Sequence, residues 1–246
     1  MGGLLLETEA WPTFGQEPDA VAGGDLAAIL RRSAARYPRL AFTCSFGGTG
    51  IVLAHVIAMR RLPIPVYFLD TGYLFPETVA LRHQYAERYG LEVIDVRPEL
   101  SVARQAERHG DELYRRDPDR CCALRKVDPM RQLLEGLDGW ISGMRRDQTA
   151  SRGEVEVLER HTLADGRVIA KINPMAHWTR QDAWRYIAGN DLPYNPLADR
   201  GYKSIGCWPC TRPVGEGEDE RAGRWSGTGK TECGLHTFTR KLPAES

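Results

Sequence analysis

Hydrophobic and polar positions along the chain alternate between helical and strand-like spacing. Apolar side chains recur at helical spacing from Leu26 to Tyr37, which predicts a first helix that Pro38 ends. Beyond it, short apolar runs typical of buried strands are followed by longer stretches that fit helices, and this order repeats. The strands are expected at residues 40–44, 66–69, 91–96 and 140–142, and two of the helices at 51–61 and from Pro76 to Gly90.

Strands that alternate with helices predict the α/β class, with a doubly wound, mainly parallel sheet covered on both faces. Two further apolar runs, 155–158 and 168–172, flank an Asp-Gly turn, which predicts a hairpin appended at one edge of the sheet. Thr179 and Asp182 have the spacing of a capping box, so another helix is expected to begin there.

Both ends of the chain lack this regular pattern. Residues 1–20 are broken by prolines, and we treat them as an N-terminal extension. Residues 21–200 are expected to form the α/β domain. The remaining segment, 201–246, holds three of the six cysteines in a stretch rich in glycine and charge, so something other than apolar burial is expected to organise it.

The charge balance limits the classes of partner. Lys and Arg number 33 and so do Asp and Glu, so the chain has no overall field to attract nucleic acid or an acidic membrane surface. Any anion site must therefore be local. No apolar run approaches the roughly 18 residues that span a bilayer, and the acidic start around Glu7 and Glu9 lacks the basic region of a signal peptide. These features predict a soluble, cytoplasmic protein.

Three loops are expected at the carboxyl ends of strands, where α/β sheets bind their ligands. The first loop offers glycine backbone N–H groups and hydroxyl groups, and the second offers a carboxylate, so both suit a nucleotide. The arginines of the third loop suit phosphate or sulfate. Each loop also has an ordinary interpretation, as a tight turn, a cap or a solvated run of charge. The candidate ligand-binding residues are Ser45, Gly47, Gly48 and Thr49, then Asp70, Thr71 and Gly72, then Arg145, Arg146 and Arg152.

Two pairs of cysteines offer four thiolates. Cys121 and Cys122 are adjacent, and Cys207 and Cys210 form a C-x-x-C motif far downstream. Four thiolates suit either zinc or a [4Fe-4S] cluster. Because neighbouring side chains diverge, adjacent cysteines are awkward ligands for one ion, whereas a cluster gives each thiolate its own iron. We favour the cluster over structural zinc and over a metal-free redox pair.

Cys233 stands apart from these pairs. Lys230 and His236 are close to it in sequence, and positive neighbours raise the thiolate fraction of a cysteine whose ordinary pKa is about 8.5. It is therefore a candidate nucleophile, with a structural cysteine as the alternative. Cys44 ends an apolar strand, and there we favour the structural interpretation.

With these residues together, the chain resembles the assimilatory adenylyl-sulfate reductases, the iron–sulfur branch of the sulfonucleotide reductase family. The resemblance runs from about residue 40 to residue 236, and the cysteine pairs and terminal motif are its most specific parts. The matching stretches are residues 69–78, Cys121-Cys122 with Arg125-Lys126, 143–148, Asn173-Pro174 with Trp178-Thr179, 192–196, 204–212, 221–225 and 232–236.

The resemblance implies an adenine-nucleotide-hydrolase-like fold that binds adenosine 5′-phosphosulfate. It implies that the Cys233 thiolate attacks the sulfate sulfur, expels AMP and leaves an S-sulfocysteine, from which thioredoxin releases sulfite for cysteine biosynthesis. Lys126, Arg221, Arg224 and His236 match positions that the family places around the phosphosulfate. The [4Fe-4S] cluster on the four paired cysteines is implied to organise the site rather than to carry electrons.

The residues leave several alternatives. Many relatives carry an acidic pair where this chain has Thr49-Gly50. Relatives that reduce the 3′-phosphorylated substrate generally lack the four cluster cysteines, which favours the unphosphorylated nucleotide, although a dual specificity is one alternative. A more distant one is an ATP-pyrophosphatase-type adenylating enzyme, and a third is a zinc-stabilised nucleotide-binding protein without catalysis. Whether the chain forms a homo-oligomer is left open.

Overall fold

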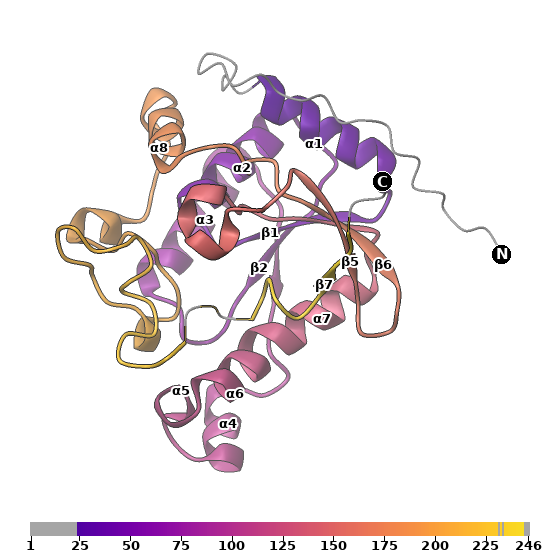
Figure 1. Ribbon diagram of the computed structural model, residues 1–246. Helices are drawn as coiled ribbons and strands as arrows, with labels where there is room; N and C mark the ends of the chain where they lie inside the picture. The colour runs from indigo at the N-terminus through magenta and orange to yellow at the C-terminus, as the bar shows by residue number, and fades with distance from the viewer. Residues whose placement is uncertain (1–23, 231, 233, 244–246) are drawn as a thin grey trace.

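A single seven-stranded sheet organises the chain. The computed structural model describes residues 24–230, 232 and 234–243, and Figure 1 shows the sheet at its centre. In the order β3-β2-β1-β4-β6 the strands are parallel, while β5 is antiparallel to β6 and β7 antiparallel to β5. The strands are β1 (Leu40–Cys44), β2 (Val66–Leu69), β3 (Val93–Val96), β4 (Gly139–Ile141), β5 (Leu158–Thr162), β6 (Val168–Ile172) and β7 (Arg240–Lys241).

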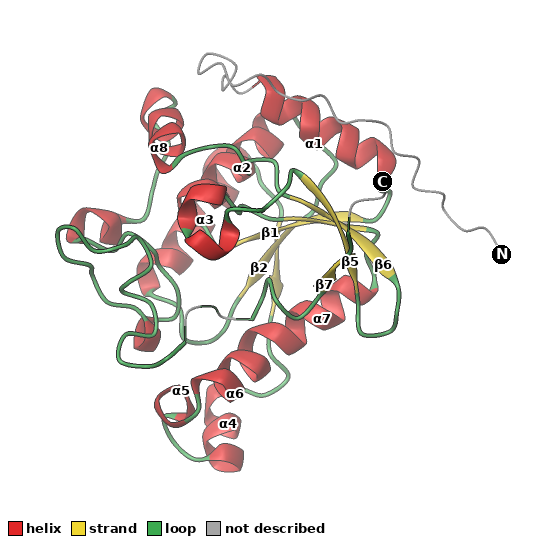
Figure 2. Cartoon of the chain, viewed as in Figure 1, coloured by secondary structure: helices red, strands yellow, loops and turns green. Residues whose placement is uncertain are grey.

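Helices cover both faces of the sheet, as Figures 1 and 2 show. Helices α1, α2, α3 and α8 lie on one side and α7 on the other, while α4, α5 and α6 extend beyond the sheet. None of the helices that the structure describes is long and apolar enough to cross a bilayer. The helices are α1 (Gly24–Arg36), α2 (Gly48–Met59), α3 (Pro76–Tyr89), α4 (Val102–His109), α5 (Leu113–Arg116), α6 (Pro118–Cys122), α7 (Asp128–Glu135) and α8 (Arg180–Gly189), with a π-helical turn η2 (Ala123–Val127) between α6 and α7.

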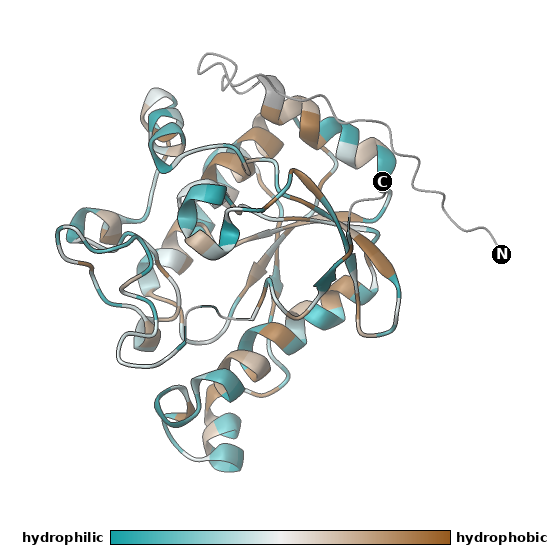
Figure 3. Cartoon of the chain, in the orientation of Figure 1, coloured by the Kyte–Doolittle hydropathy of each residue, from teal (hydrophilic) through white to brown (hydrophobic). Residues whose placement is uncertain are grey.

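The two faces of β1 contribute to two hydrophobic clusters. Leu40, Phe42 and Cys44 point into the larger cluster with α1, α2 and α8, and Ala41 points into the smaller one with α7. Helix α2 is apolar on nearly all sides, as its brown colour in Figure 3 shows. It contacts α1, α3 and α8. This arrangement is what a strand alternating between two covered faces requires.

The predicted α/β class and parallel sheet are confirmed, as are several boundaries. Gly90 ends α3 with φ 61°, in the left-handed region that glycine adopts without strain. The capping box at the start of α8 is present, because the Thr179 side chain accepts from the Asp182 N–H and the Asp182 carboxylate accepts from the Thr179 N–H. The helix predicted from Ile51 instead begins at Gly48, since the glycines of the loop form its first turn.

The predicted hairpin is present, but the bounds of its first strand are wrong. Its first strand is Leu158–Thr162 rather than 155–158, because residues 156 and 157 are bent to bind the Asn173 side chain and backbone. As predicted, the hairpin lies at one edge of the sheet, where β6 pairs with β4 and continues the parallel order, with Trp140 opposite Lys171.

The C-terminal segment is largely irregular and returns to the sheet at two places. Cys207 forms a β-bridge with Leu74, and the Trp208 N–H donates to the Tyr73 carbonyl at 2.8 Å. Further on, β7 pairs with β5 at the sheet edge. The described part of this segment is therefore attached to the β2–α3 loop at residues 207–208 and to the sheet edge at residues 240–241.

Ile141 provides a test of this core. It is fully buried on β4, so Ile141→Ala is expected to lower the free energy of unfolding by about 2–5 kcal/mol through lost burial and the cavity left behind. Ile94 is the matched control because it is 38% exposed on β3, and Ile94→Ala should change stability by less than about 1 kcal/mol. Urea unfolding of both variants measures the difference, and equal losses would contradict the assignment of Ile141 to the core.

Candidate active site

A cavity of about 280 Å³ lies at the carboxyl ends of β1, β2 and β4. The loops that follow these strands line it together with α8 and parts of the C-terminal segment, the position in which open α/β sheets bind ligands. Glu220 is its only Asp or Glu among the described residues, so the cavity suits an anionic ligand. Seven basic side chains line it: Lys126, Arg145, Arg152, Arg180, Lys203, Arg221 and Arg224.

The first predicted loop contributes its backbone and the start of α2. Ser45, Gly47, Gly48 and Thr49 all line the cavity, and the first turn of a helix has N–H groups that no intrahelical carbonyl accepts. The Thr49 hydroxyl donates to the Gly143 carbonyl at 2.8 Å. Its single proton is therefore used to join α2 to the loop after β4, and the predicted donation from Thr49 to a phosphate is not available in this arrangement.

Of the three candidate residues in the second predicted loop, only Thr71 lines the cavity. Thr71 is buried, lines the cavity and has its hydroxyl 3.3 Å from the Cys207 sulfur. Asp70 and Gly72 are not among the lining residues. The Asp70 carboxylate accepts from the Gly72 N–H at 3.0 Å and from Arg97 at 3.2 Å, which is the ordinary turn alternative for this loop.

In the third predicted loop, Arg145 and Arg146 point to different places. Arg145 is buried at the cavity, where it donates to Asp147 at 2.8 Å and to Glu220 at 3.2 Å. Arg146 instead donates to the Val155 carbonyl and to the Glu156 carboxylate, so it joins the loop to the chain before β5 and does not line the cavity.

Glu232 links two cavity arginines to the terminal motif. Its carboxylate accepts from Arg152 Nε at 3.1 Å and from a terminal nitrogen of Arg152 at 2.9 Å, and it also accepts from Arg221 at 3.0 Å. The candidate nucleophile Cys233 lies outside the described residues. Its chain neighbour Glu232 is thus fixed at the cavity, and Leu235, slightly further on, lines it.

Arg224 and His236 each have a buried nitrogen atom without a hydrogen-bond partner among the described residues. Arg224 stacks over Trp225 at 4.5 Å and lies so close to Gly206 that a side chain there would collide with it. Its Nε and the Nδ1 of His236 have no hydrogen-bond partner among the residues described. Both side chains line the cavity, so two buried polar atoms beside it lack a hydrogen-bond partner among the residues described.

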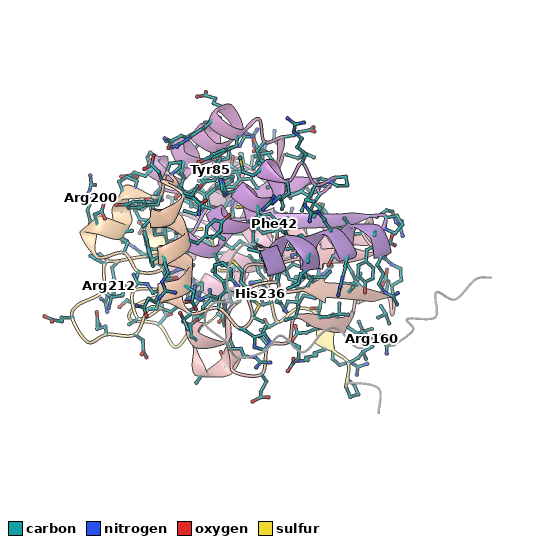
Figure 4. The ribbon with its side chains drawn as sticks, turned by 90° about the horizontal axis from the view of Figure 1, so that it is seen from above. Phe42, Tyr85, Arg160, Arg200, Arg212 and His236 are labelled. Atoms are coloured by element: carbon teal, nitrogen blue, oxygen red, sulfur yellow. The ribbon has the colours of Figure 1, made fainter. Side chains whose placement is uncertain are left out.

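The His236 ring is stacked on Trp140, with centroids 5.5 Å apart and planes 7° apart. Figure 4 shows it near the centre of the molecule, well inside the rim where Arg200 and Arg212 lie. Burial lowers the pKa of His236 well below its ordinary value of 6.5, and the positive charges of Lys171, Arg152 and Arg221 lower it further. The ring is therefore neutral at neutral pH.

This pKa predicts a pH dependence of stability. The unfolded chain takes up a proton near the ordinary pKa of 6.5 while folded His236 does not, so its contribution is complete above that pH and is lost as the pH falls below it. His236→Gln is expected to flatten the fall in the free energy of unfolding between about pH 7.5 and about pH 5, measured by urea titration. The exposed His83→Gln is the control, and equal pH profiles for wild type and His236→Gln would contradict the prediction.

The four paired cysteines lie beside the cavity in one group. Burial, together with the nearby sulfurs of Cys122, Cys207 and Cys210, raises the pKa of Cys121 to about 12, so the four thiols are within electrostatic range of one another. Within residues 24–230, 232 and 234–243, no group of three or more His, Cys, Asp or Glu side chains is arranged around one metal ion.

The pairs are brought together by Arg125, in the π-helical turn that follows Cys121 and Cys122. Buried Arg125 donates to the Thr71 carbonyl and to the Leu100 carbonyl, both at 2.7 Å. Thr71 in turn contacts Cys207, whose pKa is lowered because attraction by Lys126, the Thr71 hydrogen bond and the Arg224 charge outweigh the effect of burial. Lys126 thus bonds to Cys207 and lines the cavity, which connects the cysteine group to the candidate site.

Several lining residues were not singled out from the sequence. Trp140 lies in an apolar strand and resembles any core residue, while Gln148 had no pattern of its own. Arg180 and Lys203 were missed because each stands in a polar stretch that also fits a solvent-exposed surface. The one usable signal was Glu220 beside Arg221, an acidic residue next to a candidate ligand-binding arginine.

Comparisons with known proteins agree with this geometry. Residues 39–213 match the phosphoadenosine phosphosulfate reductase domain. Adenosine 5′-phosphosulfate reductase 1 of Bacillus subtilis is 48% identical over 94% of this chain and 100% of its own, and the adenosine 5′-phosphosulfate reductase of Bacillus pumilus is 42% identical with the same coverage. A phosphoadenylyl-sulfate reductase crystal structure from Candida auris superposes with a TM-score of 0.67 at 29% identity, over 80% of this chain and 98% of that one.

The fold and the basic cavity at its strand ends are those of a sulfonucleotide-reducing oxidoreductase. The chain belongs to the phosphoadenosine phosphosulfate reductase family, in its adenosine 5′-phosphosulfate reductase branch. The resemblance seen in the sequence is thereby confirmed, and sulfate reduction through adenosine 5′-phosphosulfate is the activity that these relatives support.

Proposed function

We propose that the chain reduces adenosine 5′-phosphosulfate to sulfite and AMP, with thioredoxin as electron donor and an S-sulfonated Cys233 as intermediate. The observation that carries the proposal is the basic cavity, in which seven Lys and Arg side chains converge and two of them bind Glu232, the neighbour of Cys233. A substrate that carries a phosphate and a sulfate needs such a concentration of cationic donors.

The reaction takes two steps. The Cys233 thiolate attacks the sulfate sulfur, so a sulfur–sulfur bond forms while the bond to the bridging oxygen breaks and its electron pair leaves on AMP. A thioredoxin thiolate then attacks the Cys233 sulfur, and sulfite leaves with the bonding electrons. The second thioredoxin thiol resolves the mixed disulfide, which oxidises thioredoxin and restores Cys233.

The chain's own residues align the reactants and neutralise charge. Lys126 and Arg224 are placed to bind the oxyanions of the phosphosulfate, because both line the cavity. Neutral His236 presents its ring to the same space, stacked on Trp140. Since AMP is a stable leaving group, orientation and electrostatic stabilisation account for most of the catalysis that the protein must supply.

Cys121, Cys122, Cys207 and Cys210 fit a [4Fe-4S] cluster, and we propose them as its ligands. Burial and then repulsion between the sulfurs raise the pKa of Cys121 to about 12 and that of Cys210 to about 11, an effect that cationic iron would relieve, whereas Lys126 and its neighbours already lower the pKa of Cys207. Four irons also give the adjacent cysteines separate ligand positions. When bound, the cluster would tie α6 to the 207–210 turn and add its charge to the field at Lys126.

The setting of the reaction follows from its chemistry. A thioredoxin-dependent enzyme whose free thiols must stay reduced works in a reducing compartment, and we propose the cytoplasm. None of the cysteines that the structure describes forms a disulfide. Sulfite is the product, so the enzyme's place is in sulfate assimilation, ahead of the further reduction that supplies sulfur for cysteine.

Intact-mass analysis tests the proposed function directly. Anaerobic protein incubated with adenosine 5′-phosphosulfate, without thioredoxin, is expected to gain the mass of one SO₃ group, and peptide mapping is expected to find it on Cys233. Addition of reduced thioredoxin should remove the group and release one equivalent of sulfite. Protein that forms no adduct while it turns over substrate would overturn the proposed intermediate.

The 3′-phosphorylated nucleotide is a second candidate substrate, because the Candida auris structure to which this chain is similar is a phosphoadenylyl-sulfate reductase. The relatives of higher identity are adenosine 5′-phosphosulfate reductases, which favours the unphosphorylated form. Adduct formation measured with each nucleotide at equal concentration distinguishes a strict enzyme from a dual one.

A further inference from the structure

Glu232 occupies cationic groups that the proposed substrate needs. Arg152 is nearly buried, with only 8% of its side chain exposed, and it lines the cavity. Two of its three guanidinium nitrogens donate to Glu232, and the third donates to Gln148. This fork-to-fork geometry is also the one in which arginine binds phosphate or sulfate, so the fork cannot hold Glu232 and a substrate anion in this way together.

Arg221 is engaged by the same carboxylate. It donates to the oxygen of Glu232 that also accepts from Arg152, so one carboxylate bridges both guanidinium groups. The Glu232 side chain is itself only 18% exposed, which makes the contact a partly buried one that solvent screens little. A substrate anion that takes these arginines must therefore replace a strong internal ligand.

Arg224 differs from Arg152 and Arg221 in its hydrogen-bond partners. Arg224 lines the same cavity, yet its Nε is buried without a hydrogen-bond partner among the described residues. Arg224 donates to the Ser204 hydroxyl and pairs with no carboxylate of the described residues, whereas the Arg152–Arg221 pair already binds a group with the same sign of charge as the substrate.

We propose that Glu232 is an internal competitor for the substrate: its carboxylate occupies the Arg152–Arg221 pair as a stand-in anion, and an anionic group of the nucleotide displaces it on binding. The inference rests on the proposed function, since it needs an adenosine phosphosulfate in this cavity. The carboxylate can return when AMP leaves, which favours product release.

Removal of the negative charge should therefore tighten binding. In a Cys233→Ser background, which prevents turnover, Glu232→Gln is expected to bind adenosine 5′-phosphosulfate about five- to tenfold more tightly than the parent, the lower part of the usual range for coupled equilibria. Glu232→Asp keeps the competing charge and should bind close to the parent. Uncharged adenosine should gain nothing from Glu232→Gln. Isothermal titration calorimetry measures all of these affinities.

A matched control lies in the same segment. Glu218 accepts from Arg212 through both of its oxygens, but this pair is exposed and does not line the cavity. Glu218→Gln should leave the affinity for adenosine 5′-phosphosulfate unchanged. A merely structural role for Glu232 would make Glu232→Gln bind more weakly, the opposite sign to the one expected here.

The binding measurements distinguish failure of the Glu232 competitor from failure of the proposed function. Tighter binding of adenosine 5′-phosphosulfate by Glu232→Gln, with adenosine unaffected, supports the competitor. Equal or weaker binding, or an equal gain for adenosine, overturns it while leaving the proposed function in place. A failure of both the parent and Glu232→Gln to bind adenosine 5′-phosphosulfate would overturn the proposed function itself, and the competitor with it.

Discussion

Cys233→Ser is expected to abolish sulfite release, with a fall in kcat of about 10³-fold or more, the scale seen when an enzyme loses its nucleophile. A serine hydroxyl is far less ionised than a thiol at neutral pH, and it forms no sulfur–sulfur bond with the substrate. Binding should survive, because the cationic side chains that line the cavity are unchanged. The variant should therefore bind nucleotide and retain the metal content of the wild type.

Cys44→Ala is the control for Cys233→Ser. Burial raises the pKa of Cys44 to about 12, so its thiol stays protonated, and it lies in the hydrophobic core beneath the first loop. Cys44→Ala should form the S-sulfonate adduct as the wild type does. It should lower the free energy of unfolding of the protein slightly. Turnover by Cys233→Ser near the wild-type rate would refute the proposed nucleophile.

The fold was predictable from the sequence wherever short-range chemistry determines it. Gly90 had to follow a helix because it can adopt a positive φ, and the capping box of α8 needs only Thr179 and Asp182, three residues apart. The hairpin was predicted but the bounds of its first strand were not, because the chain before Leu158 is held by Asn173, whose side-chain amide donates to the Glu156 carbonyl. Periodicity alone does not encode such a contact between neighbouring strands.

The same distinction explains the site. The loops at the strand ends were found because their position follows from sheet topology, and the arginines because of their charge. Whether a particular arginine faces the ligand depends on partners far away in the chain. Arg152 meets Glu232 across 80 residues, whereas Arg146 turns back to the chain before β5. Nothing in the sequence of the loop that holds both arginines distinguishes these directions.

The link between the cysteine group and the cavity is the clearest long-range feature. Arg125 fixes the Thr71 carbonyl, Thr71 contacts the Cys207 sulfur, and Lys126 contacts Cys207 from the cavity side. One turn of π-helix thus holds both the arginine that contacts Thr71 beside the cysteine group and the lysine that lines the cavity. Such turns occur often at functional sites.

Cys207→Ala is expected to lose most of the bound iron and to loosen the C-terminal segment. Cys207 is buried against Leu74 and Thr71, and it begins the turn that returns the segment to the sheet. If the cluster joins this turn to α6, loss of one thiolate removes a tie between segments more than 80 residues apart, and metal binding contributes directly to folding. Iron analysis of anaerobically purified protein measures the first effect.

Hydrogen exchange measures the second effect. Residues 207–225 should exchange faster in Cys207→Ala than in the wild type, while β1 and α2 in the main core should keep their protection. Cys44→Ala is again the matched control, since it removes an equally buried thiol that lies outside the cysteine group, and it should keep full iron content. Full iron content in Cys207→Ala would remove this residue from the ligand set. Loss of iron with unchanged exchange would show that the segment is held by its hydrogen bonds to Tyr73 and the sheet rather than by the cluster.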